Sequence, residues 1–200
     1  MASTDSPDPY IDPKTGLLRN SVNAQTQSSL SKIEAAASFA RQLSLVNNPA
    51  PLPRNLQGLQ KIHYWLFQDV YPWAGEVRTV DIRKPVGRKE PFAPAKFILV
   101  AANNAFSDLH VENYLKGMSR SQFIHQLAHH YDQLNYIHPF REGNGRTLRL
   151  FFSQLADEAG WHILWDDVLG ETNDEACRIA VEERKLAPLQ HMFNEIVSRN

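Results

Sequence analysis

The hydrophobic pattern of the chain is mostly helical, because apolar residues recur every three or four positions over long stretches. A first helix is predicted over residues 27–46, where the repeating positions are Leu30, Ile33, Ala37, Ala40 and Leu43. The Pro-containing stretch NNPAPLPR then ends this helix. A second helix is predicted over residues 55–69, where the repeating positions are Leu56, Leu59, Ile62 and Leu66.

Five more helices are predicted further along the chain. The first runs from about Pro94 to Leu109. In the next, from the N-cap Ser119 to about Tyr136, the inward positions are Phe123, Ile124, Leu127, Tyr131 and Leu134. Another starts near Asn144 and is stopped by Gly160. Two final helices are predicted over residues 171–185 and 187–198.

One segment departs from the helical spacing. Residues 76–92, EVRTVDIRKPVGRKEPF, place short Val/Ile-rich runs around a Pro/Gly/Lys turn, which is typical of a β-hairpin. The charges Lys84, Arg88 and Lys89 are interpreted as solubilising groups of that turn. The predicted fold class is therefore mainly α, a helical bundle with one small β-hairpin.

Composition narrows the class of protein. The chain has 200 residues, enough for one domain with a sizeable core, and a Ser/Asp/Pro-rich start predicts a flexible tail over residues 1–10 before a single domain over 11–200. A net charge of −1 gives no basic field that would attract nucleic acid. No apolar run reaches the roughly 18 residues of a membrane span, and no secretory signal opens the sequence.

Cys177 is the only cysteine, so no internal disulfide can form. A reducing cytoplasmic location fits this cysteine usage. Cys177 itself is interpreted as a small apolar residue of a helix rather than a reactive thiol.

Candidate chemistry concentrates between His138 and Arg149, in the stretch HPFREGNGRTLR. Gly143 and Gly145 allow a turn that points backbone N–H groups into one concavity, and the start of the following helix adds a partial positive charge. This arrangement is suited to a phosphate. Arg146 is three positions before Arg149, so both guanidinium groups share a helix face and can bind a polyphosphate.

Two further groups complete the candidate site. Glu142 would repel bound phosphates unless a divalent cation lay between them, which makes it a candidate Mg²⁺ ligand. His138 can accept a proton near neutral pH, so it is a candidate general base. A base, a metal ligand, a phosphate-binding turn and two arginines within twelve residues predict a nucleotide-phosphate transfer site.

A His-ligated metalloenzyme is a weaker alternative. His125 and His129 stand four apart on a predicted helix, as in zinc proteases, with His138 as a third possible ligand. However, Gln126 occupies the position where such proteases need a glutamate as general base. Packing or a structural hydrogen bond is therefore the preferred interpretation of these histidines.

The stretch matches the pattern H-x-F-x-[D/E]-G-N-G-R-x-x-R at every fixed position, and on it the chain resembles the Fic-domain proteins. Residues 11–20 (IDPKTGLLRN) resemble the short N-terminal entry of the family. Residues 63–80 (HYWLFQDVYPWAGEVRTV) resemble the segment leading into its target-binding hairpin, and Pro91 to Ala93 resemble the hairpin's return. The resemblance covers most of the chain from residue 10 to about 160 and implies the Fic fold.

The resemblance also implies a role for each motif residue. His138 is then the base that takes a proton from a target hydroxyl, Phe140 the apolar anchor of the loop, and Glu142 the Mg²⁺ ligand. The phosphate-binding residues implied are Gly143, Asn144, Gly145, Arg146 and Arg149. The hairpin from Asp81 to Phe92 resembles the flap that clamps an extended segment of the target by strand-like pairing.

The activity implied is transfer of AMP from ATP to a Tyr, Thr or Ser hydroxyl of a protein. Relatives that transfer phosphate or phosphocholine usually depart from G-N-G-R, which this chain keeps. An inert Fic-like binding or regulatory module is the alternative, and intact His138, Glu142 and Arg149 argue against it. Small stand-alone relatives include bacterial toxins that modify the ATPase subunits of DNA gyrase and topoisomerase IV.

Fic proteins are commonly restrained by a helix carrying [S/T]-x-x-x-E-[G/N], whose glutamate pairs with the second arginine of the motif. In this sequence only Glu112 and Glu142 are followed by Asn or Gly, and neither has Ser or Thr four positions earlier. The resemblance therefore predicts a toxin restrained by a separate small antitoxin, which supplies a glutamate to Arg149.

Overall fold

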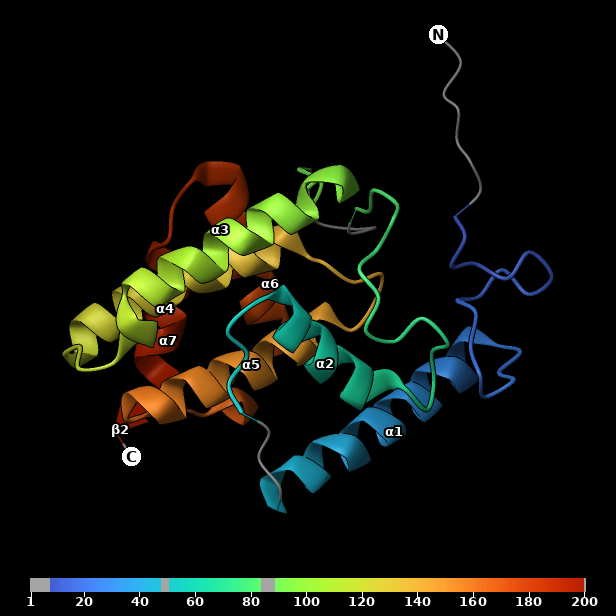
Figure 1. The fold of residues 1–200 in the computed structure, drawn as a ribbon, viewed down its shortest axis with the longest axis horizontal. Coiled ribbons are helices and arrows are strands. Elements are labelled where there is room, and N and C mark those ends of the chain that lie inside the picture. The colour runs from blue at the N-terminus through green and yellow to red at the C-terminus, as the bar shows by residue number, and fades with distance from the viewer. Residues whose placement is uncertain (1–7, 48–50, 84–88, 200) are drawn as a thin grey trace, which may run out of the picture. The chain divides into compact units, whose positions relative to one another are not determined.

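A computed structural model describes residues 8–47, 51–83 and 89–199, and these residues are mainly helical (Figure 1). The predicted turn charges Lys84 and Arg88 lie outside this part of the chain. No helix among the described residues is both long enough and apolar enough to cross a membrane.

The fold class predicted from the sequence is confirmed. The helices are α1 (Gln27–Asn47), α2 (Leu56–Phe67), α3 (Ile98–Val111), α4 (Arg120–Ile137), α5 (Asn144–Ala159), α6 (Gly170–Glu183) and α7 (Ala187–Ile196). Short 3-10 turns are formed by Ala95–Phe97, Asn113–Leu115 and Trp165–Asp167. Two strands, β1 (Trp161–Ile163) and β2 (Val197–Arg199), pair antiparallel with Trp161 opposite Arg199.

The chain falls into two compact units. One comprises residues up to 50 together with 60–76, and the other comprises residues 51–59 and 77–200. The single Fic domain over residues 11–200 stays a prediction.

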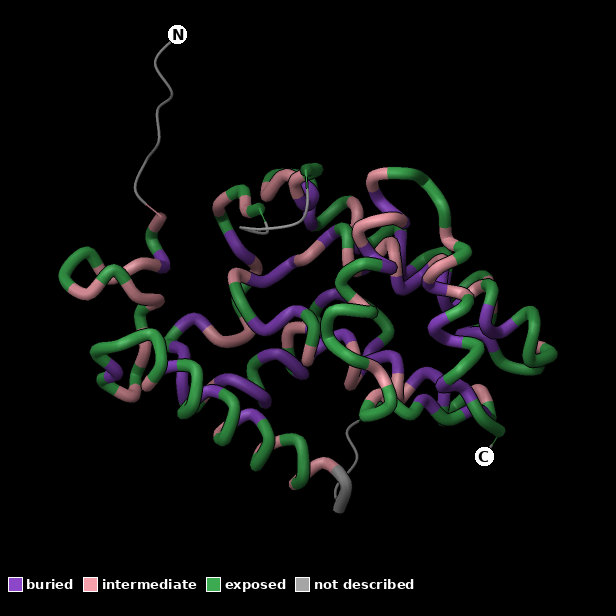
Figure 2. The backbone as a smooth tube through the Cα atoms, turned by 180° about the vertical axis from the view of Figure 1, so that it is seen from behind, coloured by how far each residue is buried: buried purple, intermediate pink, exposed green. Residues whose placement is uncertain are grey.

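In the first unit, α1 buries a different face from the one expected. Leu30 is buried, but Ile33 is 36% exposed and Leu43 is 51% exposed. The next buried positions of α1 are Glu34 and Ser38, and long exposed stretches of the helix are visible in Figure 2. The reason is polar bonding: the Tyr71 hydroxyl donates a hydrogen bond to the Glu34 carboxylate. A buried acceptor with a partner replaces the apolar contact that helical spacing predicted.

The entry to the first unit is ordered from within the predicted tail. Tyr10 is buried, and its ring meets that of Trp73 edge to face at 5.4 Å. The flexible tail over residues 1–10 stays a prediction. Nearby, the fully buried His63 accepts a hydrogen bond at its Nδ1 atom from the Gly75 N–H at 2.7 Å.

The second unit is built around α4, which contacts α3, α5, α6 and α7 (Figure 1). All five residues predicted to face inward on this helix are buried: Phe123, Ile124, Leu127, Tyr131 and Leu134. Ser119 begins α4 with a capping box, in which it and Gln122 exchange side-chain to backbone hydrogen bonds. The helix is thus fixed at its start by this cap and along its length by its neighbours.

The predicted hairpin is not a regular pair of strands. Its outgoing arm (residues 76–83) and its return arm (residues 89–93) contain no strand. Between the described residues of the arms, the Phe92 backbone N–H donates to the Ile82 carbonyl at 3.4 Å. The small sheet of the fold is formed by β1 and β2 instead.

Backbone groups of both arms bind the end of α4 and the segment that follows it. The Arg78 N–H donates to the Pro139 carbonyl at 2.9 Å, and the Ala93 N–H donates to the carbonyl of Tyr136, in the last turn of α4, at 3.0 Å. These two groups are therefore not available for pairing between the arms.

Candidate active site

The candidate catalytic loop joins α4 to α5, and left-handed residues lie at both of its ends. His138 caps the C-terminus of α4 with φ 48° and ψ 62°, and Gly143 caps the N-terminus of α5 with φ 79°. A positive φ costs a residue other than glycine strain energy, and such strain is typical of functional sites. The loop therefore reverses the chain between two packed helices and presents His138 at the junction.

The His138 ring is fixed on two sides. Its Nδ1 atom lies 3.1 Å from the Asn135 carbonyl. Because a carbonyl oxygen only accepts hydrogen bonds, Nδ1 carries the hydrogen and Nε2 carries the lone pair. The Phe92 ring stacks on the imidazole with centroids 3.6 Å apart and planes 13° apart. His138 thus has the tautomer and the fixed orientation that a general base needs.

Asn144 shapes the loop with its side chain. Its amide nitrogen donates to the Phe140 carbonyl at 2.7 Å, and its amide oxygen accepts from the Phe140 N–H at 2.9 Å. Both residues are buried, and Phe140 is fully so. The apolar anchor predicted at Phe140 is present, and the amide of Asn144 closes the loop over it. The backbone N–H of Asn144, at the start of α5, is a further candidate donor to a phosphate.

The first turn of α5 fits an anion. The Gly143 carbonyl accepts hydrogen bonds from both the N–H and the hydroxyl of Thr147, which fixes the turn. A Cβ added at Gly145 would meet only the Arg149 Nη2 atom, at 3.9 Å. Protein packing therefore does not require a glycine at position 145, and the space beside it suits a ligand that approaches the backbone.

Arg146 and Arg149 lie on the first two turns of α5, half-buried. Tyr131 of α4 is buried, and its hydroxyl donates a hydrogen bond to the Asn173 side chain at 2.8 Å. Burial raises the pKa of Tyr131 far above its usual range, while Arg149 acts on it in the opposite direction. The tyrosine therefore stays neutral and does not compete with phosphate for the arginines.

Glu142 is exposed at the edge of the loop, and one of its carboxylate oxygens accepts the Gly143 N–H at 2.9 Å. No group of three or more His, Cys, Asp or Glu side chains able to hold a metal ion occurs in the part of the chain that the structure describes. A protein-only metal cage is thus not built among these residues. A carboxylate beside an anion site matches Mg²⁺, which takes one or two carboxylates together with substrate phosphates.

Arg78 is a site residue that sequence reasoning missed. It is 2% exposed, and its guanidinium donates to the carbonyls of Val80, Ala93, Ile137 and His138. One buried side chain thereby links both arms to the catalytic loop. The available signal was an arginine inside the Val-rich run EVRTV, which is an unusual place for a charge.

The metalloenzyme alternative gains no support from the described residues. The His125 ring bonds to the side-chain amide of Gln190 at 3.0 Å. His129 packs its ring against His130 at 5.2 Å. These contacts agree with the preferred interpretation, packing or a structural hydrogen bond. Cys177, as expected, is a buried residue of α6.

Comparison with known proteins identifies the class that this fold and loop define. The model of the Fic/DOC family matches residues 53–156, which include the whole catalytic loop. The chain belongs to the Fic/DOC family.

Among relatives, the chain is 35% identical to the probable protein adenylyltransferase Fic of Escherichia coli K12, over 96% of this chain and 92% of that protein. It is 40% identical to the protein adenylyltransferase VbhT of Bartonella schoenbuchensis, over 88% of this chain but only 36% of VbhT. These relatives place the chain among the protein adenylyltransferases, the class of enzyme that the sequence predicts.

Solved structures agree. The BepC effector of Bartonella tribocorum, with bound AMPPNP, superposes with a TM-score of 0.89 at 25% identity over 96% of this chain and 97% of that one. The N-terminal Fic domain of a Bep effector of Bartonella quintana, with bound ADP, gives 0.90 at 25% identity over 96% and 95%. The Fic fold is therefore confirmed.

Proposed function

We propose that this chain transfers AMP from ATP to a Tyr, Thr or Ser hydroxyl of a target protein. The observation that carries the proposal is the geometry of the loop: the fixed His138 imidazole lies at one end and the anion-binding turn with Arg146 and Arg149 at the other. The AMPPNP and ADP bound in the two Bartonella structures support the proposal that this chain binds a nucleotide.

The reaction divides between the two ends of the loop. The target hydroxyl gives its proton to Nε2 of His138 as its oxygen attacks the α-phosphorus. The bond from that phosphorus to the oxygen bridging to the β-phosphate breaks, so AMP stays on the target and pyrophosphate leaves. Arg146 and Arg149 hold the leaving phosphates and offset their growing charge.

Mg²⁺ fits this site as a partner of the nucleotide. Glu142 would hold it together with phosphate oxygens, and the ion would neutralise phosphate charge when bound. The exposed position of the Glu142 carboxylate beside the turn leaves it accessible for this role.

An inert binding module is the alternative function. It would have no need of a histidine with a defined tautomer beside an arginine pair. The intact His138, Glu142 and Arg149 favour catalysis over this alternative.

The proposal also covers which protein is modified and how the enzyme is restrained. The target's extended segment binds along the hairpin from Asp81 to Phe92. ATPase subunits of type II topoisomerases are the proposed targets. The enzyme is the toxin of a toxin–antitoxin pair in the cytoplasm, and its antitoxin donates a glutamate to Arg149.

Growth tests the toxin proposal directly. The wild-type chain expressed alone in bacteria is expected to inhibit growth, whereas the His138→Ala variant is expected to be harmless at equal expression. If the purified wild-type chain is inert with ATP until an internal glutamate is replaced, the inhibitor lies within the chain and the antitoxin is unnecessary.

Labelling tests the target. The wild type is incubated with α-³²P-ATP, Mg²⁺ and bacterial lysate, and each labelled band is identified by mass spectrometry. Labelled topoisomerase ATPase subunits would support the proposed target. Label on other proteins alone would overturn that target and retain the AMP transfer.

A further inference from the structure

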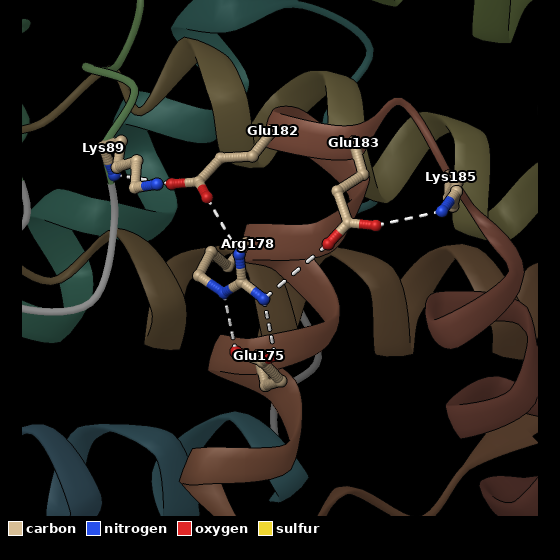
Figure 3. Close-up of polar contacts among 6 residues, drawn as sticks. All are labelled: Lys89, Glu175, Arg178, Glu182, Glu183 and Lys185. Atoms are coloured by element: carbon tan, nitrogen blue, oxygen red, sulfur yellow. Dashed lines mark hydrogen bonds and ion pairs between the residues drawn. The ribbon is translucent and has the colours of Figure 1, made fainter.

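The carboxylate of Glu182, at the end of α6, contacts the return arm of the hairpin (Figure 3). One of its oxygens accepts the Lys89 N–H at 2.5 Å, and the other accepts from Arg178 at 2.8 Å. The Glu182 side chain is only 12% exposed. A side chain far along the sequence therefore binds the backbone at the start of this arm.

Arg178 holds Glu182 in place because it is itself held on its other side. It makes two hydrogen bonds to the Glu175 carboxylate, at 2.7 and 2.8 Å, from one turn earlier on α6. Its guanidinium is thus hydrogen-bonded to the carboxylates of Glu175 and Glu182, with the Glu183 carboxylate further away at 3.9 Å (Figure 3). The Glu182 carboxylate is oriented by its own helix before the arm binds to it.

The start of the return arm is tied to this carboxylate through the Lys89 N–H. This hydrogen bond lowers the pKa of Glu182 below its usual range, and the Glu90 N–H acts in the same direction. The Lys89 N–H is therefore not left to pair with another strand.

The end of the return arm is committed as well. Pro91 has no N–H, the Phe92 N–H donates to Ile82, and the Ala93 N–H donates to Tyr136. A target segment that adds to this hairpin by strand pairing therefore obtains no backbone donor from Lys89 or from residues 91–93. The return arm acts as a support for the binding edge.

The end of the return arm contacts the candidate catalytic base, His138. The Phe92 ring, three residues after Lys89, is the ring that stacks on His138. Arg78 binds the carbonyl of Ala93 just beyond it. The arm is consequently held at its end by the catalytic loop and at its start by Glu182.

We infer that Glu182 is a positioning residue for the protein substrate: its carboxylate fixes the start of the return arm, so that the hairpin presents a defined edge to the target. The inference rests on the proposed function for its consequence in turnover. The contact between Glu182 and the arm can be measured without any turnover.

Hydrogen exchange of the full chain measures the contact. In Glu182→Gln, exchange at the amides of Lys89 and Glu90 is expected to be roughly tenfold faster than in wild type, because a charge-assisted acceptor is lost. Exchange in α4 and α5 should not change, which shows that the variant is folded. The matched control is Glu183→Gln, which removes the neighbouring carboxylate that pairs with Lys185 at 3.0 Å. Because Glu183 lies 3.9 Å from Arg178, too far for a hydrogen bond, this variant should leave the arm nearly as in wild type.

Kinetics measure the consequence. The probe is the lysate protein that the wild-type enzyme labels, purified. Glu182→Gln should raise KM for this protein roughly tenfold and change KM for ATP less than about twofold, because the nucleotide binds at α5. Glu182→Asp, which keeps the charge, should recover part of the loss.

Unchanged exchange at Lys89 and Glu90 in Glu182→Gln would overturn the inference. So would faster exchange accompanied by equal increases in KM for ATP and for the protein, since that pattern describes a general structural role. A wild type that labels no protein would contradict the proposed function, and the exchange experiment would still decide the role of Glu182.

Discussion

Single residues of the loop are oriented before any substrate binds. The left-handed backbone of His138, its bond to Asn135 and its stacking on Phe92 act on one imidazole. Such preorganisation reduces the cost of aligning a base with its proton. The sequence alone predicted candidate roles for His138, Glu142 and the arginine pair, because each role follows from the functional group of the side chain. The clamp made by Asn144 could not be predicted, because it depends on where the backbone of Phe140 lies.

Glu142 allows a test of metal binding at the scale of one atom. Glu142→Gln keeps the shape of the side chain and removes its charge, so Mg²⁺ should bind more weakly. Activity at low Mg²⁺ is expected to fall and to recover partly at high Mg²⁺. A titration of transfer rate against Mg²⁺ measures this shift. Activity that is indifferent both to this variant and to EDTA would show that the metal role is wrong.

Arg149 and its neighbour Arg146 are expected to bind different phosphates of the nucleotide. Arg149→Ala should weaken binding of ATP more than binding of ADP, because Arg149 is assigned to the terminal phosphates. Calorimetric titration of both nucleotides measures the two losses. Equal losses would indicate that Arg149 has a structural role.

At the scale of elements, helix ends were predicted well where a local signal marks them. Ser119 starts α4 through its capping box, and Gly160 ends α5 in the left-handed conformation. The buried face of α1 was predicted wrongly, because Glu34 is buried by a bond to a tyrosine far along the chain. Periodicity cannot anticipate such a partner. The predicted strand pairing of the hairpin was wrong for a similar reason, because its arms form hydrogen bonds with the catalytic loop and the end of α4.

Arg78 joins these elements, and its loss should affect stability as well as activity. Arg78→Ala leaves several buried carbonyl groups without their donor and is expected to lower the free energy of unfolding by roughly 3 kcal/mol or more. Urea denaturation followed by circular dichroism measures the change. The control is Arg83→Ala in the same arm, where the side chain is exposed and the effect should be small. A loss of stability as small as that of the control would contradict the role assigned to Arg78.

At the scale of the whole molecule, the candidate active site lies within one of the two compact units. The loop, the return arm, the outgoing arm from Val77 onward and α6 all belong to residues 77–200. The resemblance carried by the motif predicted the fold class, because the family keeps the motif and the fold together. The division into two units was not predicted, because sequence spacing identifies helices without identifying which of them pack together.

The central claim is that His138 removes a proton while α5 holds the nucleotide. The most direct measurement compares wild type with His138→Ala, using α-³²P-ATP for transfer to protein and calorimetry for ATP binding. Transfer is expected to fall by roughly 10²- to 10⁴-fold, with ATP affinity largely unchanged. Labelling by His138→Ala at the wild-type rate, or a loss of ATP binding that accounts for the lost transfer, would contradict the mechanism.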